Sequence, residues 1–116
     1  QPETLTVKTV KTERIEFLRD GKTRVAIVVH PTQDAIVVEN SKGMPTVFLG
    51  QSLDGGLVGV HNNDGIPAAI MGTGKDGGQV EVFNNDTKRV AVMGVVKDGG
   101  ALALFSHTGR LLWSAP

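Results

Sequence analysis

Three aspartates recur at a fixed spacing and are the first candidates for chemistry in this sequence. Asp54, Asp76 and Asp98 each precede two glycines and lie 22 residues apart. Some β-rolls bind calcium through Gly-Gly-x-Gly-x-Asp motifs, which repeat at a much shorter interval. Each turn here supplies a single aspartate, and a tight turn alone accounts for an Asp-Gly pair. The motif therefore favours a turn, and calcium binding stays the weaker alternative.

Three histidines, His30, His61 and His107, are the other candidate metal ligands. Three copies of one histidine around a trimer axis would form a three-histidine site. A single histidine near the end of a strand is more typical of a polar surface position, and the sequence places none of these on an axis. We therefore assign no metal ligand.

Side chains that could catalyse a reaction lack the context that catalysis needs. Sugar cleavage requires two carboxylates about 5 to 9.5 Å apart in a cleft, but Glu39 and Glu81 fall in different repeats. The serines have no Gly-x-Ser-x-Gly surroundings. The Gly72–Lys75 segment has only part of a phosphate-binding loop, without the full spacing or a following helix. The sequence predicts a protein that is not an enzyme and uses no cofactor.

Composition excludes further classes of function. The chain has 116 residues, enough for one domain, with 12 basic and 12 acidic residues. This balance lacks the positive field of a nucleic-acid binder. There is no cysteine, so disulfides and thiolate metal sites are excluded. The longest apolar runs are too short to cross a bilayer, so we expect no membrane insertion within this segment.

A 22-residue period determines how the elements are organised. Gly56, Gly78 and Gly100 keep this step, and so do the asparagines at 40, 62 and 84. A fixed period of this length is typical of repeat architectures. Each unit holds an alternating apolar run, an Asn-containing turn, a second run that is apolar at nearly every position, and an Asp-Gly-Gly turn. The pattern predicts an all-β protein with about ten short strands.

The second run of each unit is apolar on both faces, which one chain cannot cover by itself. We expect one face to be lined by Val47, Leu49, Ala69, Met71, Ala91 and Met93, and the other by Phe48, Ile70 and Val92. An exposed apolar stripe usually marks an interface. These nine residues are therefore the predicted interface or core, in a homotrimeric β-prism or triple-stranded β-fibre.

Two other architectures fit the same period. In a single-chain β-solenoid, one 22-residue coil would form each rung, and Asn40, Asn62 and Asn84 would stack in a ladder. An up-and-down barrel is the third possibility. Within any of these, residues 1–13 form a charged lead-in or neck strand and residues 14–116 the β-repeat domain of about five two-strand units. A start at Gln1 indicates a processed terminus or a fragment, and leaves room for an upstream anchor.

The turn chemistry supports a resemblance. A turn of the form x-Asp-Gly-x-Pro, short aliphatic strands ending in glycine, and Asp-Gly-Gly before the next strand occur across residues 14–113. This alternation resembles the β-repeat modules of trimeric bacteriophage tail fibres and spikes and of bacterial surface stalks. The resemblance implies a rigid trimeric rod at an extracellular, cell-surface or virion location, and it brings no binding residues with it.

The predicted function is thus a structural module, the shaft, stalk or tip of a phage fibre or bacterial surface assembly. The alternative is a module that binds a surface glycan or a protein through its turns. Phe83 and Phe105 occupy equivalent positions and are the candidate ligand contacts, because sugars stack on exposed aromatic rings. Ordinary packing explains the same pair of residues, and is the interpretation we prefer.

Overall fold

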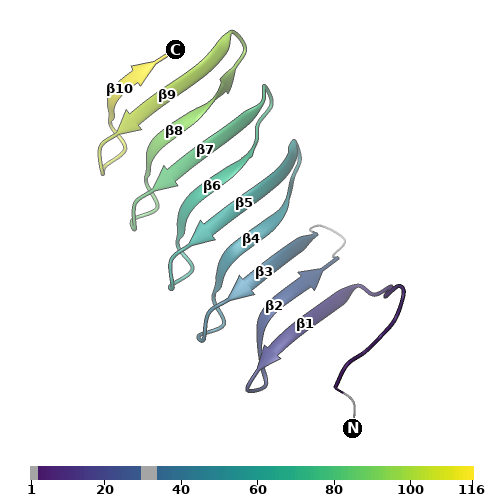
Figure 1. Cartoon of the computed structure of the whole chain (residues 1–116). Helices are drawn as coiled ribbons and strands as arrows, with labels where there is room; N and C mark the ends of the chain where they lie inside the picture. Colours follow the sequence, from purple (N-terminus) through teal and green to yellow (C-terminus); the bar gives the residue numbers. More distant parts are fainter. Residues whose placement is uncertain (1–2, 30–33) are drawn as a thin grey trace.

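The protein is a single ten-stranded antiparallel sheet in a computed structural model that describes residues 3–29 and 34–116 (Figure 1). Every strand lies beside its neighbours in the sequence, so the order in the sheet is the order in the chain. The described residues contain no helix, and the prediction of an all-β protein is confirmed. The strands are β1 (Arg14–Arg19), β2 (Lys22–Val28), β3 (Ala35–Glu39), β4 (Pro45–Ser52), β5 (Gly55–His61), β6 (Pro67–Thr73), β7 (Gly78–Phe83), β8 (Arg89–Val96), β9 (Gly99–Phe105) and β10 (Leu111–Ala115).

The solenoid and barrel alternatives are wrong. A solenoid pairs equivalent strands of successive coils in parallel, whereas here short turns reverse the chain and each strand pairs antiparallel with the next. The sheet is also not closed, because β1 and β10 lie at opposite ends of the strand order and do not pair with each other. The chain is therefore an open meander with β1 and β10 as its edge strands. Its turns lie along the two other sides of the sheet, which we call the turn edges.

The asparagine turns line one edge of the sheet and have the same hydrogen bonds each time. Asn40 Oδ1 accepts from the backbone N–H of Lys42 at 2.9 Å and of Met44 at 3.0 Å. Asn62 and Asn84 hold their own turns in the same way. The amide groups do not stack into the expected ladder. Instead, Asn40 Nδ2 donates to the backbone carbonyl of Asn63 in the next turn at 2.8 Å, so side chains link successive hairpins.

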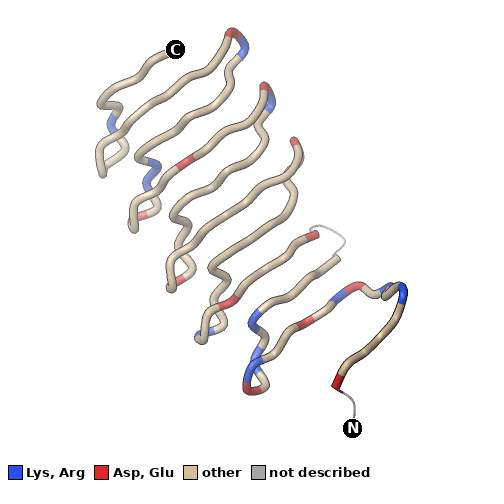
Figure 2. Tube along the Cα trace, in the orientation of Figure 1, with Lys and Arg blue, Asp and Glu red and all other residues tan. Residues whose placement is uncertain are grey.

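The Asp-Gly-Gly turns line the opposite edge. Gly55 and Gly77 have φ values of 144° and 149°, which an L-residue rarely adopts. They also lie close to the following hairpin, since a Cβ added to Gly77 would be 2.9 Å from Val95 Cβ. Charged residues gather at these two edges and around β1, while the strands between contain few of them (Figure 2). The turn chemistry therefore sets both the reversals and the spacing of hairpins.

One layer of sheet gives this chain almost no core. Ala26, 3% exposed, is the buried hydrophobic residue among those described, and no large side chain there is fully buried. The radius of gyration is 18.1 Å, against about 13 Å for a compact domain of this length. Most of the apolar surface on both faces is open or half-covered.

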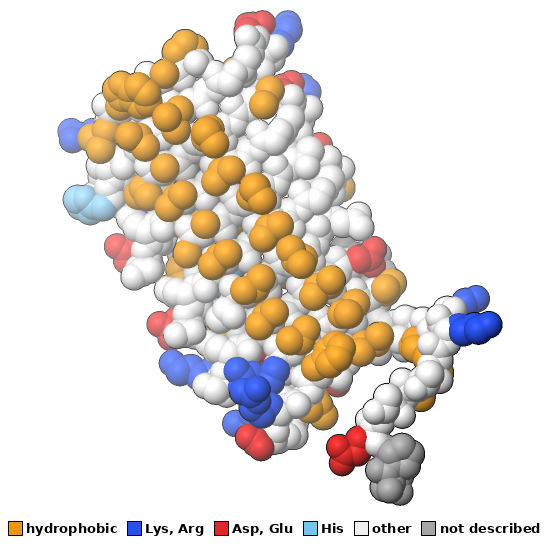
Figure 3. Space-filling view, viewed as in Figure 1, with side chains coloured by type: hydrophobic (Ala, Val, Ile, Leu, Met, Phe, Trp, Pro, Cys, Tyr) orange, Lys and Arg blue, Asp and Glu red, His pale blue; other side chains and the backbone are white. Residues whose placement is uncertain are grey.

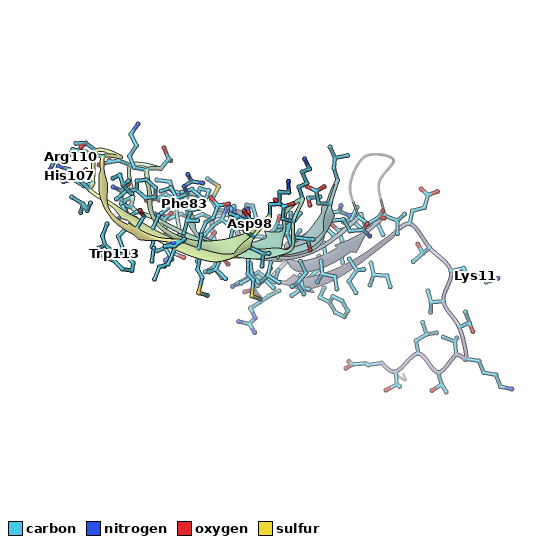
Figure 4. All side chains as sticks on the ribbon, turned by 90° about the horizontal axis from the view of Figure 1, so that it is seen from above. Lys11, Phe83, Asp98, His107, Arg110 and Trp113 are labelled. Carbon is cyan, nitrogen blue, oxygen red and sulfur yellow. The ribbon has the colours of Figure 1, made fainter. Side chains whose placement is uncertain are left out.

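The lead-in segment lies outside the strands. Residues 3–13 precede β1 without strand structure and run away from the sheet, as the position of Lys11 in Figure 4 shows. One backbone hydrogen bond ties its end to the sheet, from Val29 N–H to Glu13 O at 2.8 Å. The described part of the predicted lead-in strand, residues 3–13, therefore forms no strand.

Candidate interaction surface

Strand register places two continuous rows of apolar side chains on one face of the sheet. Residues directly paired across strands point to the same side, so each row can be followed from β1 to β10. We call this side the aliphatic face. Its rows are Phe17, Val25, Val38, Val47, Val60, Ala69, Val82, Ala91, Leu104 and Trp113, and Ile15, Ile27, Ile36, Leu49, Val58, Met71, Val80, Met93, Leu102 and Ala115.

The aliphatic face is open along its whole length. Both rows consist of apolar residues alone, and none of these residues is classed as buried. Met71 and Met93 are each 56% exposed and Trp113 is 50% exposed. Figure 3 shows the result as a band of apolar side chains running from the β1 end to the β10 end. Such a continuous apolar band is uncommon on a monomeric soluble protein, where large exposed apolar patches usually mark interaction sites or ligand-binding grooves.

The opposite side, which we call the mixed face, combines apolar, small and charged residues. Phe83 projects on this side and Trp113 on the other (Figure 4). The residues of its central row are less exposed than those of the aliphatic rows, because Ala26 and Gly59 are buried and most of the other members are half-buried. That row is Ala26, Val37, Phe48, Gly59, Ile70, Glu81, Val92, Ala103 and Ser114.

A small polar cluster lies on the mixed face near the C-terminal end. Arg89 forms an ion pair with Glu81, with Nη1 3.4 Å from Oε2. Its guanidinium carbon lies 5.5 Å from the centre of the Phe105 ring, a cation–π distance. Gln79 Nε2 donates to the other carboxylate oxygen of Glu81 at 2.9 Å. The negative charge of Glu81 is thus paired with Arg89. The cluster of Gln79, Glu81, Arg89 and Phe105 is held by contacts among its own side chains, which is not typical of a reactive site.

The structure divides the predicted interface residues between the two faces as the pattern indicated. The aliphatic face holds Val47, Leu49, Ala69, Met71, Ala91 and Met93, and the mixed face holds Phe48, Ile70 and Val92. All nine remain exposed or half-buried within one chain. Their contact with a partner chain stays a prediction.

The two candidate ligand contacts lie on the mixed face. Phe83 and Phe105 are both half-buried. The Arg89 guanidinium already lies over the Phe105 ring, so a sugar would have to displace it in order to stack there.

The candidate metal ligands are scattered. His61 Nδ1 lies 3.2 Å from the Gly65 carbonyl oxygen, within its own turn. His107 is exposed in the β9–β10 turn, and His30 lies outside the described residues. No group of three His, Cys, Asp or Glu side chains that could hold a metal occurs within residues 3–29 and 34–116.

A carboxylate of β1 has a shifted pKa for a local reason. The Arg14 guanidinium donates to Glu16 Oε1 at 2.7 Å and the Thr23 hydroxyl donates to the same oxygen at 2.9 Å. These bonds favour the charged form and lower the pKa of Glu16. The site is solvent-exposed and has no nearby cleft, so the shift reflects surface pairing.

Comparison with known proteins adds no family. Neither a protein-family model nor a curated protein matches the chain. Across the part of the chain that the structure describes, no helix has the length and apolar character needed to span a bilayer. The candidate surface therefore has to be interpreted from its own geometry.

Sequence reasoning missed two features of this surface. The side-chain amides of Asn40 and Asn84 link neighbouring turns, a role that their 22-residue spacing could have suggested. Gly56, Gly78 and Gly100 form a third row on the aliphatic face, but in the sequence they look like ordinary turn glycines.

Proposed function

We propose that this chain is a non-enzymatic structural module that assembles as a homotrimer and forms the rigid shaft, stalk or tip of a phage fibre or bacterial surface assembly. The observation that carries the proposal is the single-layer sheet with almost no buried side chain. A sheet of this kind gains its stability by burying an apolar face against another layer.

Copies of the same chain are the simplest source of that layer. Isologous or cyclic assembly covers one apolar face on every subunit with a single type of contact. Three sheets around an axis parallel to the direction of strand stacking would bury three aliphatic faces together. The turn edges, with their charged and Asn-rich residues, would face water. The resulting particle is a rod whose length is set by the number of strands.

Solution scattering tests this proposal. One chain measures 61 × 30 × 22 Å, with a radius of gyration of 18.1 Å. A trimeric rod keeps a similar long dimension but has a much thicker cross-section than one sheet. Small-angle X-ray scattering is expected to give an elongated particle with a radius of gyration clearly above that of one chain. A folded particle with the dimensions of a single sheet would contradict the proposal.

A further inference from the structure

Three glycines on the aliphatic face occupy positions where nothing within the chain itself requires glycine. Gly56, Gly78 and Gly100 pair with Gln51, Thr73 and Val95 in the register of the sheet. Each lies two residues before a member of the aliphatic rows, and therefore on the same face. All three are exposed. We call them the glycine row.

Neither backbone conformation nor internal packing requires glycine at these positions. None of the three has a positive φ. A Cβ built on each would meet only a carbonyl oxygen at 3.8 to 3.9 Å, an ordinary contact. Glycine inside a strand weakens it, and its presence often marks the close approach of another backbone. Because that carbonyl oxygen is the only neighbour this chain places within 4 Å of each built Cβ, the absent side chains leave room for another chain.

Two hollows open on the aliphatic face, and Gly78 of the glycine row lines one of them. One, of about 300 Å³, is lined by residues that include Met71, Gly78, Val80 and Met93. The other, of about 310 Å³, is lined by residues that include Ile27, Asp34, Ile36 and Leu49. Each of these four residues lies 44 positions, or two sequence periods, before its counterpart in the first hollow. The two hollows are therefore separated by a whole number of sequence periods.

The glycines of the mixed face differ, because side chains of the same chain lie beside them. A Cβ at Gly50 would overlap the Phe48 ring, and one at Gly59 would make ordinary contacts with the His61 and Phe48 side chains. Charged residues such as Glu81 and Arg89 also lie on that side. Internal packing therefore explains the mixed face, and leaves the aliphatic face as the surface without a partner.

The size and period of the aliphatic face indicate what covers it. Nine strand spacings of about 4.8 Å and two rows of side chains give it a flat area of roughly 500 Å². The uneven side-chain surface and the added area of the glycine row increase this contact area toward the roughly 800 Å² that each partner buries in a stable complex. The glycines recur every two strands and the hollows lie four strands apart, so a partner with the same 22-residue period can match both along the face.

We propose that the aliphatic face is the contact between copies of this chain, with the glycine row as the line along which a neighbouring copy's backbone approaches and the hollows as receptors for its side chains. This inference rests on the proposed homotrimer and specifies which of the two faces turns inward. The mixed face then points outward.

A pair of matched substitutions tests the assignment. Gly78→Ala adds one methyl group that the isolated sheet accommodates, and Gly59→Ala adds the same group on the mixed face. We expect Gly78→Ala to raise the concentration at which the assembly dissociates by tenfold or more, measured by sedimentation velocity, and Gly59→Ala to leave it unchanged. An assembly that tolerates Gly78→Ala would overturn the inference. Loss of assembly with Gly59→Ala alone would also overturn it, but leave the homotrimer in place.

Thiol labelling provides a second readout that is independent of stability. The chain has no cysteine, so one introduced thiol reports one position. Val80→Cys lies on the aliphatic face and Gln79→Cys next to it on the other side. In the assembled protein, maleimide is expected to label Gln79→Cys at least tenfold faster than Val80→Cys. Equal rates in the assembled protein would contradict the inference, whereas a wild-type protein that is monomeric would contradict the proposed function itself.

Discussion

Thr87 occupies a position that glycine holds in the equivalent turns. Gly43, Gly65 and Gly109 have φ values of 80°, 81° and 92°, and Thr87 adopts 64°. A left-handed conformation is strained for a β-branched residue. The Thr87 hydroxyl donates to the Asp86 carbonyl at 2.6 Å, which offsets part of that strain.

We therefore expect Thr87→Gly to stabilise the protein. Relief of the left-handed strain is worth about 1 kcal/mol, less the entropy that glycine loses on folding. Thermal unfolding at one fixed protein concentration is the appropriate measurement, since assembly makes the midpoint depend on concentration. Gly65→Thr, at the equivalent position, should lower the midpoint. A Thr87→Gly protein that melts below wild type would show that the turn carries no strain.

At the scale of the hairpin, side-chain amides join turns that are neighbours only in space. Asn40 Nδ2 donates to the Asn63 carbonyl and Asn84 Nδ2 to the His107 carbonyl. Ser106 occupies the equivalent position in the β9–β10 turn, where its hydroxyl accepts from Arg110 N–H but offers no amide. Serine therefore keeps the turn contact, and its side chain has no amide that could donate to a neighbouring turn.

Asn40→Ser should remove that link while keeping an acceptor for the turn. One neutral hydrogen bond contributes about 0.5–1.5 kcal/mol, so we expect a loss of stability of that order in denaturant unfolding. Asn63→Ser is the matched control, because it retains the backbone carbonyl that accepts from Asn40 Nδ2 at 2.8 Å and loses only the longer contact of that nitrogen with Asn63 Oδ1 at 3.5 Å. Equal losses for the two variants would contradict a role for the amide.

Contact between hairpins also constrains the opposite edge. Gly77 and Gly99 have similar φ values of 149° and 144°. A Cβ at Gly77 would meet Val95 Cβ at 2.9 Å, whereas one at Gly99 would have no neighbour within 4 Å. Gly77→Ala should therefore lower stability by more than Gly99→Ala, by about 1–3 kcal/mol, as overpacking does. Similar midpoints in denaturant for the two variants would indicate that only backbone strain matters.

At the scale of the whole molecule, local pattern predicted the strands well. Alternation in QVEV placed Val80 and Val82 on one face and Glu81 on the other, and the register bears this out. Turn residues predicted both kinds of chain reversal. The period alone could not choose between parallel coils and antiparallel hairpins, because both return equivalent residues to the same face. The close reversals at the Asn and Asp-Gly-Gly turns decide it in the structure.

The candidate surface was only partly visible in the sequence. Met71 and Ile70 could be assigned to opposite faces from strand geometry, but their exposure depends on whether another layer covers them. The sequence does not distinguish the role of Gly78 from that of Gly77. In the structure, Gly78 has open space beside it, whereas Gly77 lies against Val95. That distinction requires the positions of neighbouring strands, which no local pattern contains.

The most direct measurement is the mass of the purified chain in solution by light scattering coupled to size exclusion. In the proposed assembly, other copies of the chain cover the aliphatic face, so we predict a single species at three times the chain mass of 12.2 kDa. A monodisperse 12.2 kDa species that unfolds cooperatively would show that one sheet is stable alone, and would contradict the account.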